Sequence, residues 1–394
     1  MEKILKKVLK YPYWIFAFTT IISVVLFLKM KDNSRMETDL DEYMPHDHPA
    51  FVYSDKAEEW FNIKDGIIVG VENKDGIYNT ETLEVIKKLT KTFQKMPQIE
   101  KADVTSLYTA DNIVGTEDGM DVKAFYKGIP KTDEEFSDLR EKVKSNEMVF
   151  GRLVSEDETV SVIIAAINDD VFSQEFYDEI LEVAQQAETE NIKLHVAGTP
   201  IIEGTMALLG PADMKKMVPI VLLVIILALY LILRSVRGTL FTMLVVLFST
   251  LWAFGLMAAV NVPIYAVSTM IPVMLIAIGV ADGIHLYSHL QLFVNKNPNA
   301  TKLEAIYDML HEMWKPVVMT SVTTAVGFIS LITSQVYPVK YFGIFTAFGV
   351  MAAMLFSLIL IPSGILVFGL PKARIKKENA NSDHHFAYNM AISV

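Results

Sequence analysis

Six long apolar runs dominate this sequence and restrict what it can fold into. A helix that crosses a bilayer needs about 20 mainly apolar residues, and each run is near or above that length. The runs cover residues 11–30, 217–233, 240–260, 264–290, 316–336 and 341–370. The sequence therefore predicts a multi-pass α-helical membrane protein with six transmembrane helices.

A large acidic region separates the first two runs. All but seven of the 46 acidic residues lie between Asp32 and Asp213. The net charge of −11 therefore belongs to residues 31–215 and gives no indication of a nucleic-acid partner. The chain contains no cysteine, which excludes disulfides, thiolate metal sites and a cysteine nucleophile.

Residues 31–215 have the alternating patterns of an α/β domain. Strands are predicted at 66–71, 160–167 and 193–197, and helices at 80–96 and 172–187. This order of strands and helices favours a ferredoxin-like domain inserted between spans one and two.

The distribution of Lys and Arg predicts the orientation in the cytoplasmic membrane, because positive charges collect on the cytoplasmic side. Both termini are expected to be cytoplasmic and the 31–215 domain extracytoplasmic. The first run lacks a signal-peptide cleavage site, so residues 1–30 are interpreted as a cytoplasmic start followed by the first span. Residues 216–370 form the five-helix domain. An amphipathic helix is predicted at 302–314 on the cytoplasmic interface, and residues 371–394 form a polar cytoplasmic tail.

Three ionisable residues, Asp282, His285 and His289, interrupt the fourth apolar run. At roughly 100° per residue they lie within about 60° of one another on one helix face. A charge at bilayer depth costs at least about 2.5–3.5 kcal/mol, so such residues usually serve a function. We predict a proton relay here, with Asp282 as the carrier and His285 as its partner. The alternative is that the three residues only join helices or line a static wet crevice.

The fifth run offers small and hydroxyl residues that could oppose this face. Thr320, Thr323 and Thr324 recur at helical spacing and are predicted to be hydrogen-bonding neighbours of the ionisable residues. Ordinary helix packing is the competing interpretation.

Metal transport and enzyme catalysis find little support. The 20 methionines are scattered through apolar runs, where methionine is a common filler. No H-E-x-x-H zinc motif, serine-nucleophile elbow or phosphate-binding glycine loop is present. We therefore predict neither a cofactor nor a metal, and no enzymatic activity.

Four stretches resemble one family. They are METDLDEYMPHDHPAF (36–51), VAGTPIIEG (196–204), IAIGVADGIH (276–285), and TSVTTAVGFISL (320–331) with YFGIFTAFGV (341–350). Together they resemble the resistance-nodulation-division (RND) superfamily, in particular its MMPL-type and sterol-sensing-domain branch. That likeness implies an exporter, driven by proton antiport, for lipids or other hydrophobic molecules. One departure concerns the fourth-span motif: Ala281 stands where the family usually has its acid, and Asp282 follows it.

The resemblance also implies a partner, because full-length family members contain two such six-span repeats. We expect a homodimer, or a heterodimer with another six-span chain. The alternative is that the sequence is the front half of a longer product. A second functional hypothesis is a non-transporting lipid sensor or assembly factor of the sterol-sensing type.

Overall fold

The computed structural model describes residues 11–61, 65–116, 119–167 and 173–372. They form two compact units. The inserted unit contains residues 37–212, and the helical unit contains the residues before and after it. The predicted cytoplasmic start at 1–10 and nearly all of the predicted tail lie outside the described residues.

Six described helices are long and apolar enough to cross a membrane, as the sequence predicts. They are α2 (Pro12–Asn33), α7 (Thr199–Leu233), α8 (Val236–Ala259), α9 (Ile271–Lys296), α10 (Lys302–Ile329) and α11 (Tyr337–Phe368). Short 3₁₀ turns, η4 (Ala266–Met270) and η5 (Ser330–Thr333), precede α9 and follow α10.

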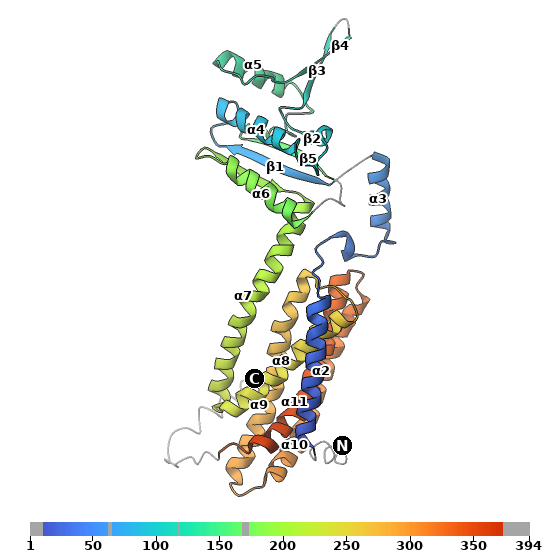
Figure 1. Cartoon of the computed structure of the whole chain (residues 1–394), viewed down its shortest axis with the longest axis vertical. Coiled ribbons are helices and arrows are strands. Elements are labelled where there is room, and N and C mark those ends of the chain that lie inside the picture. Colours follow the sequence, from blue (N-terminus) through green and yellow to red (C-terminus); the bar gives the residue numbers. More distant parts are fainter. Residues whose placement is uncertain (1–10, 62–64, 117–118, 168–172, 373–394) are drawn as a thin grey trace, which may run out of the picture. The chain divides into compact units, whose positions relative to one another are not determined.

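Helices α2, α8, α9, α10 and α11 pack into one bundle (Figure 1). The core between them is apolar and includes Val245 of α8, Leu286 of α9 and Ile361 of α11, each fully buried. The indole N–H of Trp252 in α8 donates a 2.9 Å hydrogen bond to Ser23 in α2. Helix α2 is therefore fixed to the bundle by a specific polar contact as well as by apolar packing.

The fifth span differs from the prediction. We expected a separate amphipathic helix at 302–314 before a span at 316–336, but α10 is one continuous helix with Pro316 inside it. Its start is fixed by a capping box between Thr301 and Glu304. Proline lacks the N–H that would make one backbone hydrogen bond. A long helix in a bundle tolerates that loss, so the chain does not break there.

The inserted unit contains a four-stranded antiparallel sheet in the order β2-β5-β1-β6. Its strands are β1 (Gly66–Asn73), β2 (Val104–Thr105), β5 (Val160–Ala166) and β6 (Ile192–Ala197). Helix α4 (Thr80–Phe93) connects β1 to β2, and α6 (Gln174–Ala187) connects β5 to β6. This connectivity and strand order confirm the predicted ferredoxin-like domain.

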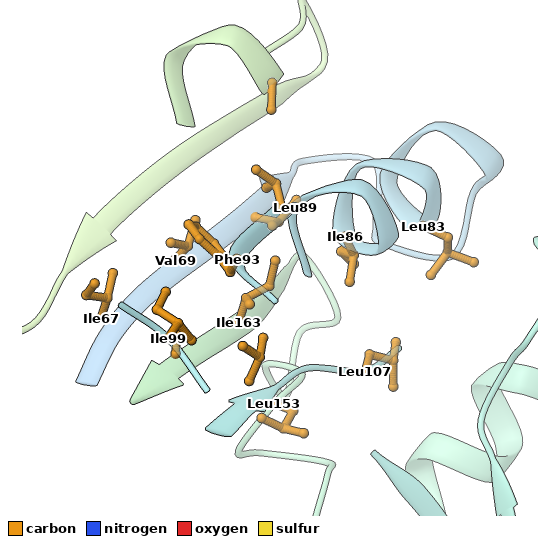
Figure 2. Close-up of a cluster of buried hydrophobic side chains, with 14 of the residues drawn as sticks. Ile67, Val69, Leu83, Ile86, Leu89, Phe93, Ile99, Leu107, Leu153 and Ile163 are labelled. Atoms are coloured by element: carbon orange, nitrogen blue, oxygen red, sulfur yellow. The ribbon is translucent and has the colours of Figure 1, made fainter. Parts of the chain in front are cut away.

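The core of the inserted unit lies between the sheet and its helices. Figure 2 shows side chains of α4, including Leu89 and Phe93, gathered with Val69 of β1 and Ile163 of β5. Alternate residues of β1 are fully buried because successive side chains of a strand point to opposite faces. Helix α4 begins where the Asn79 side chain accepts a hydrogen bond from the Thr82 N–H.

Several elements of this unit were not predicted. They are η1 (Asp41–Tyr43), α3 (Pro49–Phe61), η2 (Lys101–Asp103), the two-residue β2, the hairpin β3 (Asp111–Thr116) with β4 (Gly119–Ala124), and α5 (Asp133–Lys144). The Arg140 side chain of α5 forms a two-pronged ion pair with the buried carboxylate of Glu158. That ion pair fixes α5 to the loop before β5.

Candidate functional site

The candidate site is centred on Asp282, near the middle of α9. Helix α9 starts after η4 with Pro272 in its first turn, where a missing N–H costs nothing. The Asp282 side chain is only 5% exposed. One of its oxygens, Oδ2, accepts a 3.2 Å hydrogen bond from the Ser321 hydroxyl of α10. The sequence feature that most suggested function is therefore a buried carboxyl group held between two spanning helices.

Glycines on both sides of Asp282 bring α8 close to α9. A Cβ atom added at Gly283 would lie 2.4 Å from the Thr242 side chain of α8, and one added at Gly279 would lie 3.1 Å from Val246. The Thr242 hydroxyl is buried and has no hydrogen-bond partner among the described residues. The site therefore has tight walls, with no space beside Asp282 for larger side chains on α9.

The hydroxyl partner on α10 is not one of the predicted residues. Thr320 and Thr323 are exposed, and their hydroxyls donate to carbonyls of their own helix. Thr324 is half-buried. The prediction that Thr320 and Thr323 are hydrogen-bonding neighbours of Asp282 is wrong. The reason is that Ser321, one residue further, is rotated about 100° towards α9.

The two histidines lie in different surroundings from Asp282. His285 is exposed on the surface of the helical unit, one turn along α9. His289 is half-buried, and its Nε2 lies 3.0 Å from the Asp308 carboxylate of α10. The structure therefore separates the predicted three-residue face into a buried acid, an exposed imidazole and an imidazole–carboxylate pair.

This arrangement can couple protonation to helix contacts. A carboxylate only accepts hydrogen bonds, whereas a protonated carboxyl group also donates one. Burial in a medium of low dielectric constant disfavours the charged form. A proton gained or lost at Asp282 therefore changes its interaction with Ser321. Among the described residues, no group of three or more His, Asp or Glu side chains is placed to hold a metal ion.

The fold and the site together define a class of protein. The chain is a multi-pass membrane protein with six apolar helices, an α/β domain inserted after the first, and an acid buried in the fourth. That is the six-span unit of an RND-type membrane protein.

The comparisons with known proteins agree with this class. The sequence profile of the MMPL family matches residues 75–386, so the chain belongs to the MMPL family. A protein of Methanocaldococcus jannaschii that is named only as a membrane protein is 21% identical over 381 residues. That similarity covers 93% of this chain and 94% of the relative. The family resemblance predicted from the sequence is confirmed, and membership is consistent with a transporter-like role.

Proposed function

We propose that this chain is a proton-coupled exporter subunit that moves lipids or other hydrophobic molecules across or out of the cytoplasmic membrane. The observation that supports the proposal best is the buried Asp282 carboxyl group in α9, with Ser321 of α10 as its hydroxyl donor. An ionisable group is expensive at this depth, and its retention favours a role in which its charge changes.

In this proposal Asp282 takes up a proton from the extracytoplasmic side and releases it to the cytoplasm. One charge that crosses a potential of 100 mV supplies about 2.3 kcal/mol, which is enough to bias a two-state helix rearrangement. His285 passes the proton between Asp282 and the surface of the unit. His289, with Asp308, would exchange it nearer the end of α9.

Two apolar grooves on the surface of the helical unit favour a hydrophobic substrate. One groove of about 480 Å³ is lined almost entirely by apolar groups of four helices, including Leu222 of α7, Phe254 of α8 and Ile276 of α9. A second groove, of about 460 Å³, is lined by aromatic side chains that include Trp14 and Phe356. These volumes are in the range of small-molecule sites, and the apolar lining matches acyl chains better than polar solutes.

The same proposal places both termini in the cytoplasm and the inserted unit outside, on the basis of the Lys and Arg distribution. It also requires a second six-span half. The M. jannaschii relative is similar to this chain along 94% of its own length, so the two chains are of similar length.

A second candidate is a lipid sensor or assembly factor without transport activity. The apolar grooves favour it equally, because a sensor also needs a place for a lipid. The two functions differ in what they require of Asp282: a sensor does not need its proton.

The test uses purified protein in vesicles with an imposed pH gradient, a pH-sensitive dye in the lumen and a fluorescently labelled phosphatidylethanolamine in the bilayer. We expect the wild-type protein to move labelled lipid with dissipation of the gradient, and Asp282→Asn to abolish both. Glu312→Gln, which changes an exposed acid of α10, is the matched control and should retain both. If Asp282→Asn moves lipid with normal proton flux, the proton role is wrong.

A further inference from the structure

We propose that Arg237 and Lys302 form a binding site for the phosphate of an anionic lipid at one end of the helical unit. Arg237 is the second residue of α8, and Lys302 is the first residue of α10. Both side chains are exposed. This site is separate from Asp282, so the inference goes beyond the proposed function and does not depend on proton coupling.

The two cations converge on the end of α11. The Lys302 ammonium donates a 2.9 Å hydrogen bond to the Leu366 carbonyl oxygen. The Arg237 guanidinium donates a 3.5 Å hydrogen bond from Nη1 to the Leu370 carbonyl oxygen. A Cβ atom added at Gly369 would lie 3.6 Å from Nη1 of Arg237 and 4.0 Å from Cε of Lys302. Side chains from two different helices therefore bring positive charge to the same point of the surface.

Contact with α11 leaves most of the capacity of both cations unused. A guanidinium has five N–H donors and an ammonium has three, and each side chain gives one to a carbonyl oxygen. Among the residues that the structure describes, no carboxylate forms an ion pair with Arg237 or Lys302. Glu304, two residues after Lys302, accepts the Thr301 N–H at 2.8 Å within the capping box. Two neighbouring like charges repel each other, so the arrangement favours an anion with several acceptor oxygens, such as a phosphate.

Exposed apolar side chains beside the cations indicate that the anion is part of a lipid. Each of the three helix ends that meet here exposes one of them: Val236 of α8 at 70%, Leu303 of α10 at 60% and Phe368 of α11 at 58%. Val236 and Leu303 are the immediate sequence neighbours of the two cations. A free phosphate gains nothing from these groups, whereas the acyl chains of a lipid remove them from water.

The lipid belongs to the cytoplasmic leaflet in the orientation proposed above, because α8 and α10 begin and α11 ends on the cytoplasmic side. Anionic head groups collect near basic residues at the ends of spanning helices. A head group at this site contacts three helix ends at once, which the two cations alone join through single hydrogen bonds. The expected ligand is therefore a phospholipid with a net negative charge, such as phosphatidylglycerol.

Thermal unfolding of the purified full chain in mixed micelles gives the first test. Phosphatidylglycerol should raise the Tm of the wild type more than phosphatidylcholine, which has the same phosphate but no net charge. Arg237→Gln combined with Lys302→Gln should lose this preference. The control pair, Lys296→Gln combined with Lys315→Gln, removes two other exposed lysines and should keep it. Arg237→Lys combined with Lys302→Arg retains both charges and should also keep it.

Native mass spectrometry gives a second measurement that does not depend on unfolding. The wild type, released from micelles that contain both lipids, should retain one phosphatidylglycerol per chain. Either single variant, Arg237→Gln or Lys302→Gln, should bind it at least about tenfold more weakly, because a charge-assisted hydrogen bond is lost. Leu303→Gln should weaken it as well, because an apolar contact with the lipid is removed. Inorganic phosphate added to phosphatidylcholine micelles should not raise the Tm as phosphatidylglycerol does.

Three results would overturn the proposal. One is a wild type equally stable in the two lipids, or a control pair that loses the preference as fully as the Arg237 and Lys302 variant. Another is a glutamine double variant that is destabilised equally in both lipids and keeps the preference, which would mean that the two cations only cap α11. The third is stabilisation by inorganic phosphate as strong as that by phosphatidylglycerol, which would mean a site for a free anion. Asp282→Asn should bind phosphatidylglycerol as the wild type does, so failure of the exporter role and failure of this site can be told apart.

Discussion

Gly198 joins β6 to α7, and its replacement by alanine should weaken the inserted unit markedly. Its φ of +121° is a conformation that residues with a side chain rarely adopt. A Cβ atom there would lie 2.1 Å from the Gly66 carbonyl oxygen at the start of β1 and 3.3 Å from the Ile67 Cα. The obstacle is backbone, so it cannot move aside by changing a rotamer.

The magnitude follows from two contributions. A side chain in a disfavoured φ/ψ region costs about 1–3 kcal/mol. To relieve the clash, the end of β6 must move away from β1 at the point where Ala197 pairs with Ile68. The loss of one hydrogen bond between the two strands costs about 1 kcal/mol. We therefore expect Gly198→Ala to destabilise the β1–β6 pair by about 2–4 kcal/mol.

Hydrogen exchange of the full chain in detergent measures this effect where it occurs. A loss of about 1.4 kcal/mol raises the equilibrium constant for local opening tenfold. Amides of β1 and β6 should therefore exchange about 30 to 700 times faster in Gly198→Ala. The relation holds when exchange proceeds through local opening of the native state. Peptides from the helical unit should keep their wild-type rates.

Gly151→Ala is the matched control. Gly151 also has a positive φ, +75°, but a Cβ atom there would meet nothing within 4 Å. Gly151→Ala should lower the local stability by only about 1–2 kcal/mol, and the exchange rates of the β6 amides should not change. Equal exchange of β1 and β6 in the two variants would refute the reasoning, because it would mean that the approach of Gly198 to Gly66 is not constraining.

Three further predictions concern single contacts. Ser321→Ala removes the hydroxyl donor of Asp282 and should lower proton-coupled lipid movement in vesicles. The hydrogen bonds from Arg140 hold the pKa of Glu158 below its ordinary value. At pH values above the ordinary glutamate pKa of about 4.3, the ionised Glu158 therefore stabilises the inserted unit. This stabilisation is lost as the pH falls through the lower pKa that Glu158 has in the folded state. The free energy of unfolding of wild type and Glu158→Gln, measured at several pH values, tests this prediction. Gly283→Leu should destabilise the helical unit by several kcal/mol, seen as a lower melting temperature, because α8 occupies the space.

Each of these has its own control. Thr320→Ala should transport normally, because its hydroxyl donates within α10; equal defects in both variants would contradict the role of Ser321. A Glu158→Gln protein as acid-sensitive as wild type would contradict the pH prediction. Gly327→Leu should cost far less than Gly283→Leu, since the space around Gly327 is open. An equal loss in the two variants would show that contact with α8 is not responsible.

The sequence patterns predicted the elements whose burial is periodic. Strand β5 alternates buried and half-buried residues, β1 buries Ile67, Val69 and Val71, and α4 buries residues at helical spacing, so these elements could be recognised. Helix α5 buries only Leu139 and Val143, and β2 has two residues. Such short or polar elements are held by their neighbours, and no local pattern marks them.

The candidate site was predictable only in part, for a physical reason. Asp282 stood out because an acid in a long apolar helix is costly wherever the helix lies. Ser321 did not, because a run of hydroxyl residues on α10 does not reveal how that helix is rotated about its axis. One residue changes the direction of a side chain by about 100°, so neighbouring hydroxyls differ completely in what they contact.

The same geometry explains why the predicted ionisable face divides. Asp282 and His289 are seven residues apart, about 20° from each other around α9, and both reach α10, through Ser321 and Asp308. His285 lies about 40–60° to one side of that line and is exposed. One helix cannot cover all three positions. Contact with α10 therefore accounts for the acid and one histidine, whereas His285 stays on the exposed face of α9.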